Sequence, residues 1–171
     1  MKSDKVRVLI CPLDWGLGHA TRCIPLIREL IENGAEVIVG SDGLQLTLLQ
    51  TEFPGIEFVR LPGYNVSYGK RLPVAIKVLT DAPRLLRMIA KEHKEMNKII
   101  RELQPDMVIS DNRYGLWNKN VYSVFITHQV NIIAPAALML YAPVLRLATR
   151  YHMKHYDESW IPDFAGKLNL S

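Results

Sequence analysis

Short apolar runs alternate with segments of helical spacing along nearly the whole chain. The first run, Val6–Cys11, is almost continuously apolar, which is typical of a strand covered on both faces. Further strands are predicted at Glu36–Gly40, Ile56–Leu61, Asp106–Asp111, Val121–Thr127 and Glu158–Pro162. Strands that alternate with helices are joined by right-handed crossovers, and such connections produce a parallel sheet.

The segments between these runs supply the helices. Helical spacing covers Ile24–Ile31 and stops at Asn33-Gly34, and a short helix is expected at Leu44–Leu49. A loop over Pro62–Pro73 follows the third strand, and Pro83 is predicted to open a long helix. Another helix is expected within 135–155. The fold class is therefore α/β, a Rossmann-like three-layer sandwich with a mainly parallel sheet in strand order 3-2-1-4-5-6.

Composition narrows the class of protein. The 171 residues, 49% of them hydrophobic, fit one globular domain with a sizeable core. A net charge of +4 favours anionic ligands in general and does not indicate nucleic acid, so no nucleic-acid partner is expected. Two cysteines without metal spacing and a start without a signal peptide predict a cytoplasmic protein. The uncharged stretch 120–145 is interrupted by polar residues and prolines, which argues against a membrane span.

The segment after the first strand carries the chemistry. It reads Asp14-Trp-Gly-Leu-Gly-His19 and leads into a helical pattern. Gly16 and Gly18 allow a sharp turn, and the helix start behind them offers N–H groups to an anion. His19 adds a titratable group at that point, which suits proton transfer to or from a phosphorylated substrate.

The predicted topology brings distant residues to one place. Strands 1 and 4 are neighbours whose connections run to opposite faces, and ligands bind in the crevice at such a switch point. His19 follows strand 1 and Asp111 closes strand 4, so both are expected there. Asn112 and Arg113 follow, and His128 and Gln129 end the neighbouring fifth strand.

The motif Gly16-Leu-Gly-His-Ala-Thr-Arg22, with Pro25 and the later Ser110-Asp111-Asn112, resembles the amino-terminal half of a GT-B glycosyltransferase. The branch it resembles is the one related to the N-acetylglucosaminyltransferase MurG of peptidoglycan synthesis. The resemblance extends over nearly the whole chain, including Trp160-Ile-Pro-Asp-Phe164. It implies that residues 1–171 form the acceptor-side domain, and that the carboxyl-terminal, donor-binding domain is absent from this chain.

The resemblance also implies an inverting transfer of a sugar from a nucleotide-sugar donor, UDP-linked in this family, to an acceptor hydroxyl. The acceptor would be a lipid or a cell-envelope glycan. His19 would be the base and Asp111 would orient its imidazole, while Gly16 and Gly18 would steady diphosphate oxygens. The other substrate-binding candidates are Asp14, Thr21, Asn112, His128 and Gln129. No cofactor or metal is implied, and the sequence has no Asp-x-Asp motif.

Simpler interpretations stand beside each of these. His19 could cap the helix, Asp111 could be a structural carboxylate, and Asp14 could stabilise the turn; His128 could be a packed or loop residue. Asp42, near the end of strand 2, would suit a dinucleotide site, but Thr21 occupies the third glycine position of that motif. A nucleotide-sugar hydrolase of the same fold and a non-catalytic acceptor-binding subunit remain as alternatives.

Two basic patterns bear on membranes. Cationic residues recur every three or four positions on the long helix at Arg87, Lys91, Lys94, Lys98 and Arg101. Glu92, Glu95 and Glu102 are close enough in sequence to neutralise part of this stripe, so a solvated face is the plainer interpretation. The apolar segment Leu138–Leu145, with basic residues after it, could make a peripheral contact at the inner face of the cell membrane. A helix packed on the sheet or under the absent domain explains the same pattern without a membrane.

Overall fold

The computed structural model describes residues 5–63, 74–127 and 142–162. In these ranges it has an α/β fold with a six-stranded, wholly parallel sheet in the order β3-β2-β1-β4-β5-β6, which confirms the predicted order. The strands are β1 (Arg7–Cys11), β2 (Glu36–Ser41), β3 (Glu57–Arg60), β4 (Met107–Asp111), β5 (Tyr122–Ile126) and β6 (Glu158–Trp160). The helices are α1 (Leu17–Glu32), α2 (Gly43–Glu52), α3 (Val74–Leu103) and α4 (Ala142–Met153).

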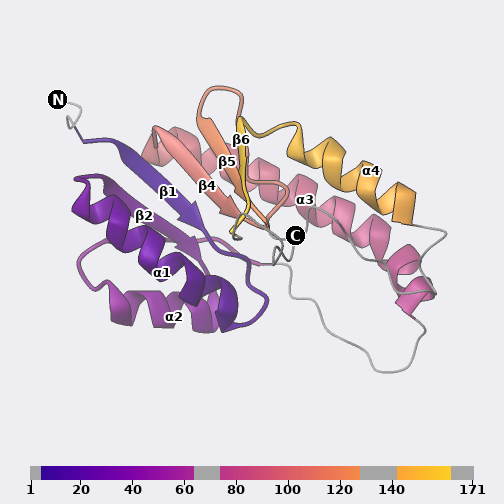
Figure 1. The fold of residues 1–171 in the computed structure, drawn as a ribbon, viewed down its shortest axis with the longest axis horizontal. Coiled ribbons are helices and arrows are strands. Elements are labelled where there is room, and N and C mark those ends of the chain that lie inside the picture. The colour runs from indigo at the N-terminus through magenta and orange to yellow at the C-terminus, as the bar shows by residue number, and fades with distance from the viewer. Residues whose placement is uncertain (1–4, 64–73, 128–141, 163–171) are drawn as a thin grey trace, which may run out of the picture.

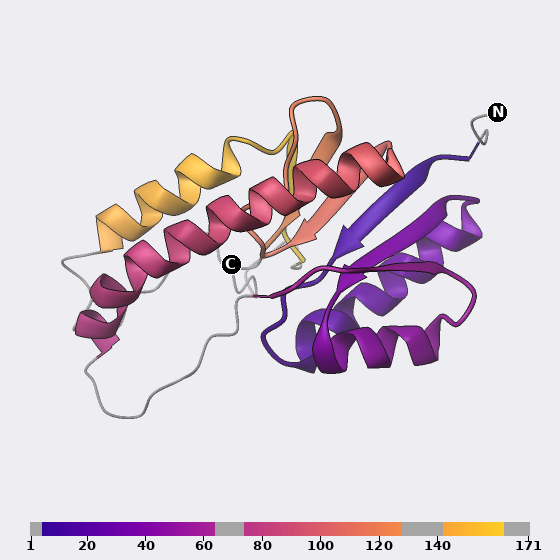
Figure 2. The ribbon, with the colours of Figure 1, turned by 180° about the vertical axis from the view of Figure 1, so that it is seen from behind.

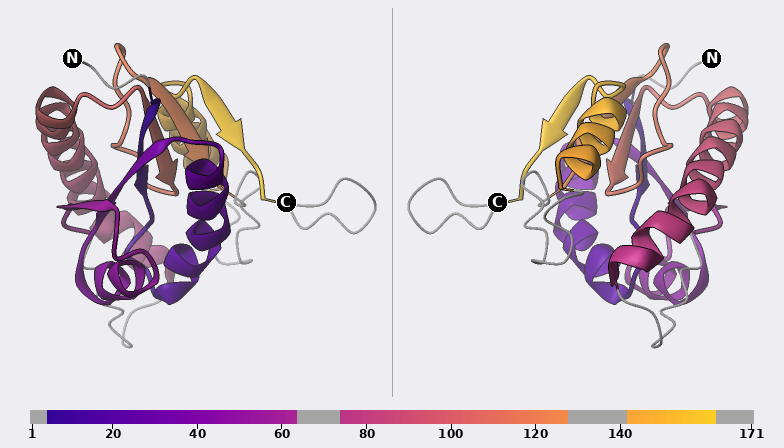
Figure 3. Two further views of the ribbon diagram at one scale, coloured as in Figure 1. Left: turned by 90° about the vertical axis from the view of Figure 1, so that its left-hand side faces the viewer. Right: turned by 90° about the vertical axis from the view of Figure 1, so that its right-hand side faces the viewer.

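Helices cover both faces of the sheet. Helices α1 and α2 lie on the face that points toward the viewer in Figure 1, and α3 and α4 lie on the opposite face, seen from behind in Figure 2. The edge-on views of Figure 3 show α1 and α3 with the sheet between them. This arrangement follows from right-handed crossovers that leave the centre of the sheet in opposite directions.

Alternate side chains of the central strands enter two cores. Val8 and Ile10 of β1 pack with Ile27 of α1, whereas Leu9 and Cys11 pack with Met96 of α3. The strands are apolar on both faces because both faces are covered, as the uninterrupted apolar runs in the sequence predict.

Two helices begin earlier than the sequence predicts. Helix α1 starts at Leu17 rather than at Ile24, because Gly16, with φ 74°, turns the chain directly into the helix. Helix α3 starts at Val74, so the prediction that Pro83 opens it is wrong. A proline inside a helix lacks the N–H bond to the preceding turn and its ring crowds a carbonyl of that turn, but a helix of 30 residues retains enough other hydrogen bonds to continue through it.

The charged residues of α3 divide between solvent and core. Arg87, Lys91, Lys94, Lys98 and Arg101 are exposed, as a solvated stripe requires. Glu92, however, is buried and faces the sheet, so the expectation that it neutralises the stripe is wrong. Within the described residues, no helix combines the length and the apolar character needed to cross a membrane.

Candidate active site

The β1–α1 connection presents an open helix N-terminus. Gly16 is the N-cap of α1, and no side-chain cap occupies this end in the described structure. Gly18, predicted to lie in the turn, is the second residue of the helix, and His19 is the third. The first N–H groups of a helix have no intrahelical partner and favour negative charge. This end of α1 can therefore receive an anion, as the motif predicts.

The sheet register brings Asp111 against the first turn of α1. Strands β1 and β4 pair with Cys11 opposite Ser110, so Asp111 ends β4 beside the β1–α1 connection. His19 Nδ1 lies 2.8 Å from Asp111 Oδ2. The Asp111 side chain is fully buried, while that of His19 is 14% exposed. A histidine and a carboxylate 92 positions apart thus form one contact pair at the switch point.

Arg22 completes this cluster, and the sequence reasoning did not select it. Its Nε donates to Asp111 Oδ2 over 2.9 Å, and its Nη2 pairs with Asp111 Oδ1. Because the carboxylate is buried, the guanidinium offsets the unfavourable transfer of its charge out of water. The signal was present: Arg22 is three positions after His19, so both side chains share one face of a helix that begins before them.

Asp111 and Arg22 both contact the Nδ1 atom of His19. Arg22 Nη2 also lies 2.7 Å from His19 Nδ1, but Nδ1 has a single hydrogen-bonding role. An unprotonated Nδ1 would direct its lone pair at Asp111 Oδ2, which is repulsive at 2.8 Å. The guanidinium already donates to both carboxylate oxygens. A proton on Nδ1, donated to Asp111, would leave Nε2 as an acceptor.

Asn112 and Arg113 have structural partners next to this cluster. Asn112 has a left-handed backbone, with φ 56°, and its N–H donates to Ile126 O over 2.9 Å. Thr127 Oγ1 donates to Asn112 Oδ1 over 3.2 Å, so this side chain links the ends of β4 and β5. Arg113 is directed into the core toward Glu92, where its Nε donates to Oε1 over 2.5 Å.

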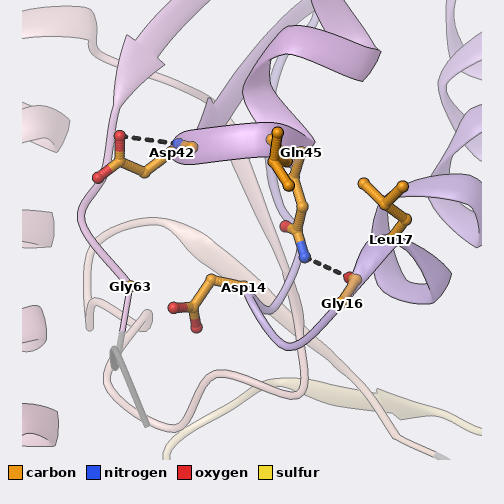
Figure 4. A pocket seen from close by; sticks show the side chains of 8 residues that line it. Asp14, Gly16, Leu17, Asp42, Gln45 and Gly63 are labelled. Carbon is orange, nitrogen blue, oxygen red and sulfur yellow. Dashed lines mark hydrogen bonds between the residues drawn. The ribbon is translucent and has the colours of Figure 1, made fainter. Parts of the chain in front are cut away.

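The other residues that the sequence predicts to bind substrate lie in three different places. Thr21 is exposed, and its hydroxyl donates to Gly18 O over 3.1 Å rather than joining His19 and Asp111. His128 and Gln129 lie outside the described residues. Asp14 and Gly16 line a separate pocket of about 220 Å³ (Figure 4).

This pocket lies between the β1–α1 connection and the start of α2. The residues that line it are Asp14, Gly16, Leu17, Asp42, Gly43, Leu44, Gln45 and Gly63. Asp42, weighed in the sequence as a ribose ligand, is the N-cap of α2: its Oδ1 accepts from Gly43 N over 2.9 Å and from Arg60 Nε over 3.0 Å. Gln45 was not among the predicted residues, because nothing in the sequence distinguishes it from other helical glutamines.

The two cysteines do not supply a nucleophile. Cys23 Sγ lies 3.9 Å from Asp111 Oδ2, and burial, together with that carboxylate, raises the pKa of the Cys23 thiol. Burial raises the pKa of Cys11 to about 12. Both groups are therefore neutral thiols at physiological pH, and thiols in that form are weak nucleophiles.

Sequence comparison finds relatives of this chain. No protein-family model matches the chain. It is 31% identical over 114 residues, 64% of its length, to an uncharacterized glycosyltransferase of Methanosarcina acetivorans, and 29% identical over 136 residues, 75% of its length, to one of Methanosarcina mazei. These alignments cover 28% and 34% of the respective relatives, so the chain spans about a third of their length.

Solved structures of other proteins superpose on this fold. A putative UDP-N-acetylglucosamine 2-epimerase of Listeria monocytogenes superposes with a TM-score of 0.58 at 11% identity, covering 94% of this chain and 40% of that protein. MurG of Acinetobacter baumannii superposes with a TM-score of 0.54 at 12% identity, covering 94% of this chain and 42% of that enzyme. At such low identity these likenesses show the fold alone.

The fold defines an architectural class. The chain has the Rossmann-like fold of GT-B glycosyltransferases, with a histidine–carboxylate–arginine cluster at the switch point. The curated relatives that it matches bear the name glycosyltransferase.

Proposed function

We propose that this chain is the acceptor-side domain of an inverting glycosyltransferase, which moves a sugar from a nucleotide-sugar donor to an acceptor hydroxyl. The observation that carries the proposal is the 2.8 Å contact between His19 and a fully buried Asp111. The names of the curated relatives support the same reaction class. The open N-terminus of α1 beside His19 suits the diphosphate of a nucleotide sugar.

His19 acts as the base in this proposal. With the Nδ1 proton donated to Asp111, Nε2 accepts the proton of the attacking acceptor hydroxyl. Asp111 maintains the tautomer and stabilises the imidazolium that forms, as carboxylates do beside catalytic histidines. The oxygen then attacks the anomeric carbon as the bond to the nucleotide diphosphate breaks, and the departing diphosphate takes the negative charge toward the helix start.

Arg22 is a positioning residue. It contacts both oxygens of Asp111 and so determines the direction from which that carboxylate faces His19. Replacing it with lysine keeps the charge and removes the planar fork. We expect Arg22→Lys to lower kcat with little change in KM, because in this proposal Arg22 acts on the substrate only through Asp111.

The test is a turnover screen of the gene product that carries this chain, with nucleotide sugars in the presence and absence of sugar and lipid acceptors. We expect acceptor-dependent transfer that falls about 10²- to 10⁴-fold in His19→Ala and Asp111→Asn. Arg28→Gln, at an exposed position on the same helix, is the matched control for Arg22 and should retain activity. Acceptor-independent sugar release would assign a hydrolase, and undiminished transfer in His19→Ala would refute the mechanism.

A lipid or cell-envelope glycan is the acceptor class that we include in this proposal. The exposed cationic stripe on α3 provides a surface that an anionic membrane would attract; it consists of Arg87, Lys91, Lys94, Lys98 and Arg101. Co-sedimentation with liposomes should then increase with the fraction of anionic lipid and decrease in a Lys94→Gln/Lys98→Gln variant. Binding that is independent of lipid charge would contradict this part of the proposal.

A further inference from the structure

Gln45 is held in one orientation beneath the β1–α1 turn. Gln45 is only 4% exposed, and its Nε2 donates to Leu13 O and to Gly16 O, in both cases over 2.6 Å. A flipped amide would place Oε1 against two carbonyl oxygens, so these contacts settle which end is nitrogen. The side chain thus fastens the turn that precedes His19 to the start of α2.

The other end of the same amide lacks a hydrogen-bond partner among the described residues. This atom, Gln45 Oε1, is buried. Gln45 lines the 220 Å³ pocket, and in Figure 4 its oxygen points away from Gly16. A buried carbonyl oxygen without a donor is unfavourable, so a donor from a bound ligand or a water molecule would stabilise it.

The chemistry of the pocket selects the kind of donor. Asp14 and Asp42 add carboxylates to the Gln45 oxygen, and this set of acceptors repels a phosphate. The start of α2 contributes N–H groups of its first turn, which are donors. A hydroxyl group both donates and accepts, so it matches this mixture.

The charge and the volume of the pocket restrict the kind of ligand that it can bind. Arg60 Nε lies 3.0 Å from Asp42 Oδ1 and partly neutralises that carboxylate, which favours a neutral ligand over an ammonium group. A pocket of 220 Å³ is smaller than those that hold drug-sized molecules, and it suits a single sugar ring.

We propose that this pocket binds a neutral, hydroxyl-bearing sugar ring of the acceptor, with Gln45 Oε1 accepting from one of its hydroxyl groups. The inference rests on the proposed glycosyltransferase function and adds the substrate class of this pocket. Gln45 then has two roles: its Nε2 holds the turn before His19, and its Oε1 accepts a hydrogen bond from the ligand. Recognition of the acceptor and placement of the base are coupled through one side chain.

Gly63 provides a way to alter the pocket without touching Gln45. A Cβ at Gly63 would overlap the Asp14 carboxylate, so Gly63→Ala displaces that side chain. A Cβ at Gly55 meets no atom within 4 Å, which makes Gly55→Ala the matched control. Asp42→Asn is a second variant, because asparagine caps helices as well as aspartate does and maintains the fold.

The experiment is an NMR titration of the ¹⁵N-labelled chain with methyl glucoside and methyl N-acetylglucosaminide, without nucleotide. We expect shifts of the Gln45 side-chain amide and of the Gly43 and Leu44 backbone amides. Affinity should fall roughly tenfold in Gly63→Ala, several-fold in Asp42→Asn, and not at all in Gly55→Ala. Spectra of the free variants show directly that each is folded.

Three results would overturn the inference. These are glycoside shifts confined to other residues, glycoside affinity unchanged in both pocket variants, and shifts of the same amides by inorganic phosphate or methylammonium but not by glycoside. The outcome is independent of turnover, because His19→Ala should bind glycoside like the parent chain. Binding without transfer would refute the proposed function alone, and transfer without pocket binding would refute this inference alone.

Discussion

The buried pair of Arg113 and Glu92 allows a quantitative test of how the fold supports the strand ends near the site. The side chains are 1% and 4% exposed, and Arg113 Nε donates to Glu92 Oε1 over 2.5 Å. Arg113 Nη2 also donates to Pro62 O over 2.8 Å, and Glu92 Oε2 accepts from Gly115 N over 2.9 Å. The pair therefore joins α3, the chain after β3 and the chain after β4.

Removing one partner leaves the other charge buried. Arg113→Met should lower the free energy of unfolding by about 3–5 kcal/mol. Glu92→Met should lower it by more, because the Gly115 N–H also loses its acceptor, which adds about 1–3 kcal/mol. The double variant leaves no uncompensated charge from this pair, so it should be only about 1–3 kcal/mol less stable than the parent.

Urea unfolding followed by circular dichroism measures these differences. With a slope of about 1–3 kcal/mol per molar urea, the single variants should shift the midpoint by about 1 M or more. The control is Arg28→Met, which breaks the exposed pair with Glu52 and should change stability by less than about 1 kcal/mol. The reasoning fails if Arg113→Met lies within 1 kcal/mol of the parent, or if the double variant loses the sum of the single losses.

Three further outcomes follow from burial. Burial raises the pKa of Cys11 to about 12 and also raises the pKa of Cys23, so both thiols should resist iodoacetamide at pH 8 until urea unfolds the chain. Mass spectrometry measures the labelling, and rapid labelling of the folded chain would contradict this expectation. Burial raises the pKa of Tyr156 well above its unfolded value near 10, so its contribution to stability is complete below pH ~10 and is lost as pH rises further; unfolding midpoints that stay constant from pH 9 to 11 would contradict it. Gly40→Ala places a Cβ 2.8 Å from the Cys11 sulfur and should destabilise by about 1–3 kcal/mol in thermal unfolding, whereas Gly55→Ala should be neutral; equal midpoints would refute the packing argument.

The sheet was predictable because its signal is local. Each central strand is an apolar run bounded by polar or turn residues, and alternation with helices restricts the topology to few choices. The helix boundaries were less accessible. Pro83 is a helix-start signal by itself, yet α3 extends back to Val74. The start of α1 depends on the left-handed backbone of Gly16, which spacing alone does not reveal.

The candidate site divides in the same way. His19 and Asp111 were predicted from the sequence to lie together, since one follows and the other ends a strand, and the topology makes these two strands neighbours. Arg22 belongs to the motif that the sequence analysis identified. Its contact with Asp111, however, depends on how the first turns of α1 are oriented toward β4. The role of Gln45 could not be predicted from the sequence. It depends on two backbone carbonyl groups of the β1–α1 connection, which accept hydrogen bonds from its side chain only in the folded structure.

The sequence by itself determined the α/β class, the order of the strands and the pair of residues brought to the switch point, because hydrophobic periodicity and crossover handedness act along the chain. Tertiary structure decided which polar side chains meet inside the protein: Glu92 with Arg113, and Arg22 with Asp111. Buried polar groups are stabilised by specific partners at hydrogen-bond distance. Such partners come from distant segments, and their pairing exists only once the helices have packed against the sheet.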